Sequence, residues 1–208
     1  MDHFIITIAR ETGSGGRNIA AKLSEQLNIP FYDRDLLRLA SDVSGIREGL
    51  FGESDERIGK LEMMTAAKKI YSGEILPPDD DDFISTKNLF EFQAKVIKEL
   101  ASSRVSCIIV GRCADYLLSN RSDVLRVFIH APLESRKKNV AYYSLAWSEK
   151  EITKYIFRED KRRAEYYRYY TGNDWRDAAH FDISLDSTVL GEDGCAETIK
   201  KALPIFTH

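Results

Sequence analysis

This sequence has few cysteines, no long apolar run and no excess of basic residues. Its 208 residues include only 3 cysteines, at positions 107, 113 and 195, without the spacing of a metal site. This odd, scattered set argues against a disulfide framework and favours a reducing compartment. The formal net charge is −3 at pH 7. A nearly balanced charge argues against a nucleic-acid backbone or an anionic membrane as the main partner.

The N-terminal segment and the apolar runs also lack targeting features. No cationic stretch precedes a long apolar segment, and no apolar run approaches the length of a membrane-spanning helix. We therefore expect a soluble cytoplasmic protein with neither a membrane nor a nucleic-acid partner. The length suits a single domain over 1–208 with a substantial buried core. None of these features indicates an oligomeric state.

The sequence does contain a strand, a glycine-rich turn and a helix, in that order, near its start. The apolar, β-branched run at 4–8 predicts a buried strand, and apolar residues recur at helical spacing between 19 and 27. The turn at 12–16 reads TGSGG. Glycines let consecutive backbone N–H groups turn inward, and a helix N-terminus adds partial positive charge. The three pieces together predict a phosphate-binding loop.

The loop meets the P-loop pattern G-x-x-x-x-G-K-[ST] only in part. Arg10 stands where the leading glycine is expected, and Gly16 stands where the lysine is expected. Asn18 replaces a threonine that is usual in nucleoside monophosphate kinases, and it still offers an oxygen to Mg²⁺. A fixed cation lost from such a loop weakens transition-state stabilisation unless another group replaces it. Arg10 and Arg17 are both candidates for that replacement.

Beyond the N-terminal unit, short apolar runs alternate with segments of helical periodicity. Further strands are expected at 31–32, 107–110, 124–129 and 181–185. Helices are expected at 34–40, 86–102, 114–118, 133–144, 148–170 and 195–203. This alternation predicts an α/β fold whose five-stranded parallel sheet carries helices on both faces. Ligands of such sheets bind at the carboxyl ends of the strands.

The segment between about 42 and 86 is more polar than the rest. Helical pieces are expected near 55–71, followed by four consecutive aspartates at 79–82. Four adjacent like charges without an apolar anchor favour a solvated loop. A metal site is the alternative interpretation, although ligand sets need a spacing that points several oxygens inward.

The order of motifs along the chain resembles the cytidylate kinase-like family, a branch of the nucleoside monophosphate kinases within the P-loop NTPase fold. The motifs are RETGSGGR at 10–17, YDR at 32–34, GR at 111–112, DKRR at 160–163 and LDST at 185–188. The resemblance implies a helical acceptor-binding insertion at 42–86 and a lid at 145–172. It also implies ATP as the phosphoryl donor, Mg²⁺ as cofactor and small-molecule nucleotides as substrates.

The resemblance further implies roles for individual residues. The residues expected to bind donor phosphates are Arg10, Thr12, Gly13, Ser14, Gly15, Gly16, Arg17, Asn18, Lys161 and Arg163. Those expected to act in phosphoryl transfer are Arg17, Asp33, Arg112, Arg158 and Arg162. The acceptor would contact Asp33, Arg34, Asp35 and Arg112. The metal would be held by Asn18 and Asp33.

Some of these residues have a simpler structural interpretation. Arg112 suits an acceptor phosphate because a guanidinium binds phosphate through two hydrogen bonds, but an ion pair with Asp115 is the alternative. One of Asp33 and Asp35 could serve the reaction while the other caps the helix that follows. We expect Asp33 to be the functional one.

The lid helix has its own alternatives. On a helix, residues 158, 161 and 162 share one face, which leaves Arg163 turned aside or paired with Asp160. A solvated helix held by i,i+4 ion pairs is the simpler interpretation. Aromatic residues at 166–170 and 175 favour packing against the sheet over stacking on a base.

Three hypotheses for function follow. The first is ATP-dependent phosphoryl transfer to a nucleoside monophosphate with a cytidylate-like acceptor. The second is a non-catalytic module that senses nucleotides or anions on a kinase scaffold. The third is a kinase for a small non-nucleotide alcohol, because YDRD at 32–35 resembles the acceptor-side carboxylates of shikimate-type kinases.

Overall fold

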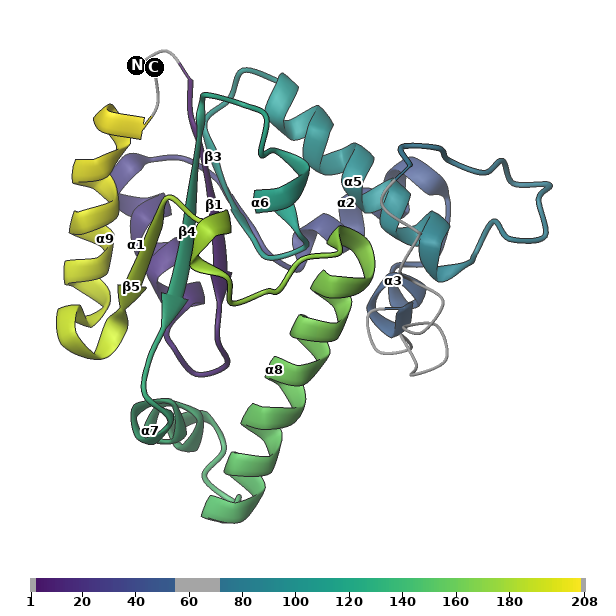
Figure 1. Ribbon diagram of the computed structural model, residues 1–208. Coiled ribbons are helices and arrows are strands. Elements are labelled where there is room, and N and C mark those ends of the chain that lie inside the picture. The colour runs from purple at the N-terminus through teal and green to yellow at the C-terminus, as the bar shows by residue number, and fades with distance from the viewer. Residues whose placement is uncertain (1–2, 55–71, 207–208) are drawn as a thin grey trace.

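Five parallel strands form the centre of the protein. The computed structural model describes residues 3–54 and 72–206, so the helical pieces expected at 55–71 lie outside the described residues. The strands are β1 (Ile5–Arg10), β2 (Phe31–Tyr32), β3 (Cys107–Val110), β4 (Val124–His130) and β5 (Ile183–Asp186). They pair in the order β2-β3-β1-β4-β5, and every pairing is parallel (Figure 1). The predicted five-stranded parallel sheet is confirmed.

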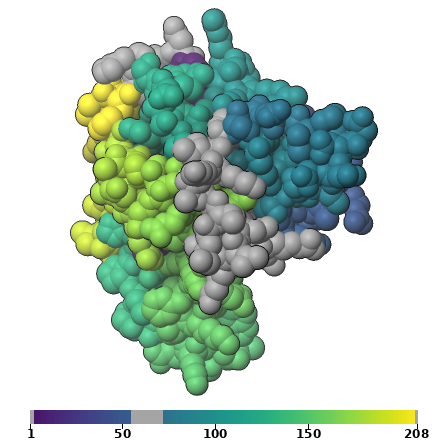
Figure 2. Space-filling model, turned by 45° about the vertical axis from the view of Figure 1, so that its right-hand side comes forward, coloured from purple at the N-terminus to yellow at the C-terminus, as the bar shows by residue number. Residues whose placement is uncertain are grey.

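Helices cover both faces of this sheet (Figure 1). One face carries α1 (Gly16–Leu27) and α9 (Ser187–Phe206). The other carries α2 (Asp35–Ser44), α3 (Glu48–Ser54), α5 (Thr86–Ser102) and α6 (Ala114–Leu117). Two further helices, α7 (Leu133–Tyr143) and α8 (Glu149–Thr171), form a hairpin that projects from the sheet. Figure 2 shows this hairpin as a lobe at the lower end of the molecule.

The strand β1 shows why the sheet is covered on both faces. Its side chains alternate between the two sides, as in any strand. Ile6 and Ile8 pack with α1 and α9, whereas Ile5 packs with α2 and α5. All three isoleucines are fully buried. A strand apolar on both faces is stable only between two helical layers.

Several helices and strands begin or end at other residues than expected, and the structure contains elements that were not expected. The second helix continues to Ser44, and α3 was not predicted because its few apolar residues set up no helical period. A 3₁₀ turn (Ala178–His180) precedes β5, which begins two residues later than expected. The last helix starts at Ser187 and is interrupted at Gly191, where φ is 67°.

Two helix starts follow the sequence closely. Helix α8 begins with a capping box, a pattern that the sequence carries as Ser148 and Glu151: the Ser148 side chain accepts from the Glu151 amide, and the Glu151 carboxylate accepts from the Ser148 amide. Helix α5 begins after Ser85, whose hydroxyl accepts a hydrogen bond from the amide of Asn88. Both caps satisfy amide groups that a helix leaves without partners inside itself.

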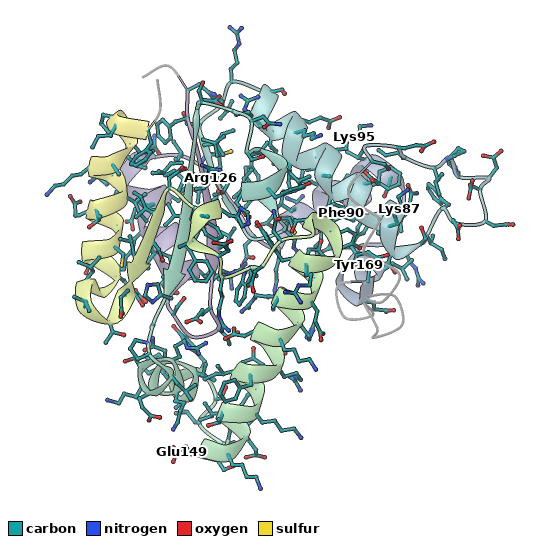
Figure 3. The ribbon with its side chains drawn as sticks, viewed as in Figure 1. Lys87, Phe90, Lys95, Arg126, Glu149 and Tyr169 are labelled. Carbon is teal, nitrogen blue, oxygen red and sulfur yellow. The ribbon has the colours of Figure 1, made fainter. Side chains whose placement is uncertain are left out.

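The aromatic residues at the end of α8 pack against the body. Tyr167, Tyr170 and Trp175 are at most 4% exposed. The ring of Tyr170 stacks on that of Phe90 from α5, with the ring centroids 3.7 Å apart. Figure 3 labels Phe90 and Tyr169 where α5 and the end of α8 meet. The packing role expected for this cluster is confirmed, and it fixes the base of the α7–α8 hairpin.

Among residues 3–54 and 72–206, no helix has both the length and the apolar character that crossing a membrane requires. This is in line with the sequence, which has no long apolar run.

The three cysteines provide a direct test of the core. Cys107, Cys113 and Cys195 are at most 3% exposed. Burial raises the pKa of all three thiols, that of Cys107 to about 11. Because the thiolate is the reactive form, we expect no reaction with Ellman's reagent at pH 8 in the folded protein, and complete reaction in urea. Fast titration of any thiol without denaturant would contradict this packing.

Candidate active site

The glycine loop between β1 and α1 leaves a row of backbone amides unpaired. Gly13 and Gly15 have φ near +80°, a conformation that other residues rarely adopt. The amides of Gly13 and of residues 15–18 make no hydrogen bond to any described residue, whereas that of Ser14 donates to the Glu11 carbonyl. Unpaired amides at a helix N-terminus form the anion-binding arrangement that the sequence predicts.

A cavity of about 680 Å³ opens beside this loop at the carboxyl edge of the sheet. Most of the residues proposed from the sequence line it. They are Arg10, Thr12, Gly13, Gly15, Gly16, Arg17, Asn18, Asp33, Arg34, Arg112, Arg162 and Arg163. Four others do not line it, namely Ser14, Asp35, Arg158 and Lys161. The size suits a nucleotide-sized ligand.

Positive charge gathers around one carboxylate in this cavity. Asp33 is 8% exposed. Its Oδ1 lies 3.1 Å from Arg10 Nη2, and its Oδ2 lies 3.2 Å from Arg17 Nε. The pKa of Arg10 falls to about 10, first because of burial and then because of the nearby Arg163, while Asp33 opposes the shift. Arg112 and Arg17 lower it further. Cations outnumber anions here, which favours binding of a polyanion.

A second carboxylate, Asp160, joins helix α8 to the glycine loop. It is 4% exposed, and its Oδ1 accepts from the Thr12 amide at 2.8 Å. Its Oδ2 lies 2.5 Å from Arg136 Nη1 on α7 and 3.3 Å from Arg176 Nη2. Arg163 also reaches Asp160 Oδ1, at 3.4 Å. One buried acid thus connects the loop, α7, α8 and the segment after α8.

Glu11 completes this network from the start of the loop. Its Oε1 lies 2.9 Å from Arg176 Nη2, and its Oε2 lies 3.5 Å from Arg136 Nε. The Ala131 amide also donates to Glu11 Oε2. Sequence reasoning missed Arg136 and Arg176, and it did not assign Glu11 a role. No local pattern distinguishes these arginines from the chain's many surface arginines, because their partners lie far away in the sequence.

The lid arginines differ from the face predicted by helical spacing. Arg163 does pair with Asp160, but it is not turned aside, because its Nη1 donates to Thr12 Oγ1 at 2.6 Å. Arg162 lines the cavity and pairs with Glu159 at 3.2 Å. Arg158 and Lys161 have side chains at least 60% exposed and pair with Glu159 and Glu165. Of the face expected from helical spacing, only Arg162 lines the cavity, and Arg163 lines it as well.

Arg112 and Asp115 have different partners in the structure. The Asp115 carboxylate accepts from the Tyr167 hydroxyl at 2.6 Å. Burial raises the pKa of Asp115 above its ordinary value, while the Tyr167 hydrogen bond lowers it. Arg112 Nη1 lies 3.5 Å from Gln93 Oε1. Arg112 lines the cavity directly after β3, facing the loop from the neighbouring strand. This placement suits the phosphate interpretation better than an ion pair with Asp115.

The residues available to a metal ion differ in part from those expected. Both oxygens of Asp33 face arginines, which makes this carboxylate a poor metal ligand. The Asn18 amide nitrogen donates to Glu192 Oε1 at 2.8 Å, so the Asn18 Oδ1 oxygen remains available. Glu192 lines the cavity beside Gly15, and sequence reasoning missed it. Within residues 3–54 and 72–206, no group of three acidic, histidine or cysteine side chains could hold a metal by itself. Mg²⁺ fits only if nucleotide phosphates supply most of its ligands.

Aromatic side chains surround the outer part of the cavity. They come from the end of α7, the following connection and α8, and they are Tyr142, Tyr143, Trp147 and Tyr155. Tyr142 and Tyr143 are 76% and 73% exposed. The sequence favoured packing over base stacking for the rings at 166–175, and it did not single out the rings near 142–155. Tyr166, Tyr167 and Trp175 also line the cavity, although Tyr167 and Trp175 are buried.

The fold and the cavity together define a class of protein. A parallel sheet in the order β2-β3-β1-β4-β5, a glycine loop from β1 into α1 and a basic cavity at the carboxyl edge are features of P-loop kinases.

Comparison with known proteins identifies the family within that class. The sequence model of the cytidylate kinase-like family matches residues 5–189. A cytidylate kinase from Sulfolobus acidocaldarius is 27% identical over 194 residues, covering 93% of this chain and 91% of that protein. A crystal structure of an uncharacterized protein from Eubacterium ventriosum has a TM-score of 0.71 and 25% identity, covering 97% and 99%. The chain belongs to the cytidylate kinase-like family.

Another solved structure supports the fold alone. Shikimate kinase from Bacteroides thetaiotaomicron has a TM-score of 0.54 and 12% identity, covering 97% of this chain and 98% of that one. The resemblance drawn from the motifs, the P-loop fold and the classification as a kinase are all confirmed.

The network around Asp160 makes a testable contribution to stability. Replacing Asp160 with alanine leaves several arginines without their shared carboxylate, and we expect the free energy of unfolding in urea to fall by about 3–5 kcal/mol. Asp193→Ala is the control, because Asp193 is 81% exposed and pairs only at the surface with Lys22. There we expect a change below about 1 kcal/mol. Equal losses in the two variants would show that the Asp160 network does not stabilise the contact between α8 and the loop.

Proposed function

We propose that this protein transfers the γ-phosphoryl group of ATP, with Mg²⁺, to a nucleoside monophosphate, and that the acceptor is cytidylate-like. The observation that carries the proposal is the row of unpaired amides at residues 15–18 in one cavity with Arg10, Arg112 and Arg163. Phosphoryl transfer needs positioning and positive charge around the migrating group more than it needs covalent chemistry. This cavity supplies both.

The donor side of the proposed site is the glycine loop. The amides at 15–18 would bind the donor phosphates, with Arg10 and Arg17 adding charge. Arg162 and Arg163 approach the same space from the lid and would neutralise charge on the migrating group. Arg158 and Lys161 lie on the exposed side of α8, and a role for them requires the lid at 145–172 to move.

The acceptor side is the edge of β2 and β3. Arg112 would bind the acceptor phosphate, because a guanidinium matches two phosphate oxygens at once. Arg34 lines the cavity next to Asp33, whereas Asp35 is exposed in the first turn of α2. Asp33 would orient Arg10 and Arg17. The segment 42–86, of which residues 55–71 lie outside the described residues, would bind the acceptor.

Mg²⁺ would be held mainly by the nucleotide, with Asn18 and Glu192 contributing oxygens directly or through water. When bound, it would neutralise charge on the donor phosphates. A cytoplasmic location and the absence of nucleic-acid partners remain predictions.

Release of ADP in a coupled assay tests the proposal. We expect turnover with ATP and Mg²⁺ that depends on a nucleoside monophosphate and is fastest with CMP. The panel should also include UMP, AMP, GMP and small alcohols such as shikimate. Tight ATP binding without turnover of any acceptor would contradict the proposal in favour of a sensor. Turnover confined to an alcohol would contradict the nucleotide acceptor.

The role of Arg112 has a matched control in the same chain. Arg112 and Arg104 both have positive φ, 59° and 58°, but Arg104 is exposed and does not line the cavity. We expect Arg112→Gln to lower kcat/KM for the acceptor by about 10- to 100-fold, the effect of one lost charge-assisted contact. Arg104→Gln should leave it unchanged. If ATP hydrolysis without acceptor falls equally, Arg112 does not act on the acceptor.

A further inference from the structure

Arg10 and Gly16 compete for the same space at the edge of the sheet. Arg10 is the last residue of β1, and Gly16 is the first residue of α1. A Cβ atom added at Gly16 would lie 2.6 Å from Arg10 Cβ and 3.0 Å from Arg10 Cγ. Both atoms belong to the base of the Arg10 side chain, which cannot swing aside. A side chain at position 16 would therefore clash with Arg10 in its present conformation.

The guanidinium of Arg10 is held at its other end as well. Its Nη2 lies 3.1 Å from Asp33 Oδ1, after β2. Its Nη1 occupies the space next to Gly111, which follows β3. A Cβ atom added at Gly111 would lie 2.3 Å from Arg10 Nη1. Two glycines from different elements therefore make room for the one arginine. The Arg10 side chain is 19% exposed, compared with 64% for that of Arg17.

These contacts give a reason for the unusual loop sequence. The P-loop pattern has glycine at the position of Arg10 and lysine at the position of Gly16. This chain has the cation and the glycine in each other's place. We infer that Arg10 supplies the fixed positive charge for the donor phosphates that the loop lysine supplies elsewhere, so that positions 10 and 16 form an exchanged pair. The inference rests on the proposed function of this site.

Arg10 suits this role better than Arg17 for a physical reason. A cation stabilises developing charge most when its position is set before the reaction. The buried stem against Gly16 and the ion pair with Asp33 fix the Arg10 guanidinium. Burial first, and then repulsion by Arg163, Arg112 and Arg17, lowers the pKa of Arg10 to about 10, and an incoming polyanion would relieve this repulsion. At neutral pH Arg10 stays fully charged.

An exchange experiment tests the inference. The variants are Arg10→Gly, Gly16→Lys and the double variant Arg10→Gly/Gly16→Lys, which restores the ordinary pattern with no change in net charge. The first readout is the affinity for inorganic tripolyphosphate by calorimetry, which requires neither acceptor nor turnover. We expect each single variant to bind at least about tenfold more weakly than the unmodified protein, and the double variant to recover most of the loss. A double variant as weak as the worse single one would overturn the inference.

Charge-conserving and matched variants keep the test valid if Arg10→Gly does not fold. Arg10→Lys should keep more of the tripolyphosphate affinity than Arg10→Gln, and equal affinities would overturn the inference. Arg126→Gln is the control for losing a half-buried arginine–aspartate pair from a strand. Arg126, labelled in Figure 3, pairs with Asp182 at 2.6 Å and does not line the cavity. The affinity of the Arg126→Gln variant for tripolyphosphate should match that of the unmodified protein.

The same measurements separate this inference from the proposed function. Tripolyphosphate binding that follows the exchange, without turnover of any acceptor, would support the Arg10 role and contradict the kinase reaction. Turnover of an acceptor that survives Arg10→Gln undiminished would support the reaction and contradict the Arg10 role. Failure of the unmodified protein to bind tripolyphosphate would contradict both.

Discussion

The contact between the Asp160 carboxylate and the Thr12 amide sets the geometry of the whole site. Asp160 lies on the lid helix, and Thr12 opens the glycine loop. Because the carboxylate is buried, its charge requires partners, and it draws in Arg136, Arg163 and Arg176. The arginine that pairs with Asp160 and also reaches the loop hydroxyl is Arg163. One buried acid, Asp160, thus sets where Arg163 of α8 lies relative to the loop.

The two acids of the site have complementary effects. Asp160 binds cations that join α7 and α8 to the loop, whereas Asp33 binds the cations that face the cavity. Neither acid neutralises all the arginines around it. Gathering these charges out of water during folding means that a bound phosphate need not reorganise them, which is the physical basis of electrostatic preorganisation. Cations fixed in this way favour the binding of polyanions in general, and they do not by themselves select an acceptor.

Neither the architecture nor the family determines which acceptor is used, so the acceptor depends on the details of the site. A shikimate kinase shares the fold at 12% identity. Fold alone therefore does not identify the substrate. In this chain the residues that differ most from the ordinary P-loop are Arg10, Gly16 and Arg17, all in or next to the glycine loop. The exposed rings of Tyr142 and Tyr143 line the same cavity.

The sequence by itself determined the sheet, most of the helices and the glycine loop between β1 and α1, because apolar periodicity, capping residues and glycines act over a few neighbouring positions. It also placed Arg112 and Asp33 at the correct edge, since parallel strands end together. Tertiary structure alone decided that Arg163 points to the loop while Arg158 points to solvent. It also brought Glu11 to Arg136 and Arg176, and placed the Arg10 stem against Gly16. Such pairings join distant parts of the chain, and a buried charge takes whichever partner the packed elements bring within reach, a choice that no local pattern encodes.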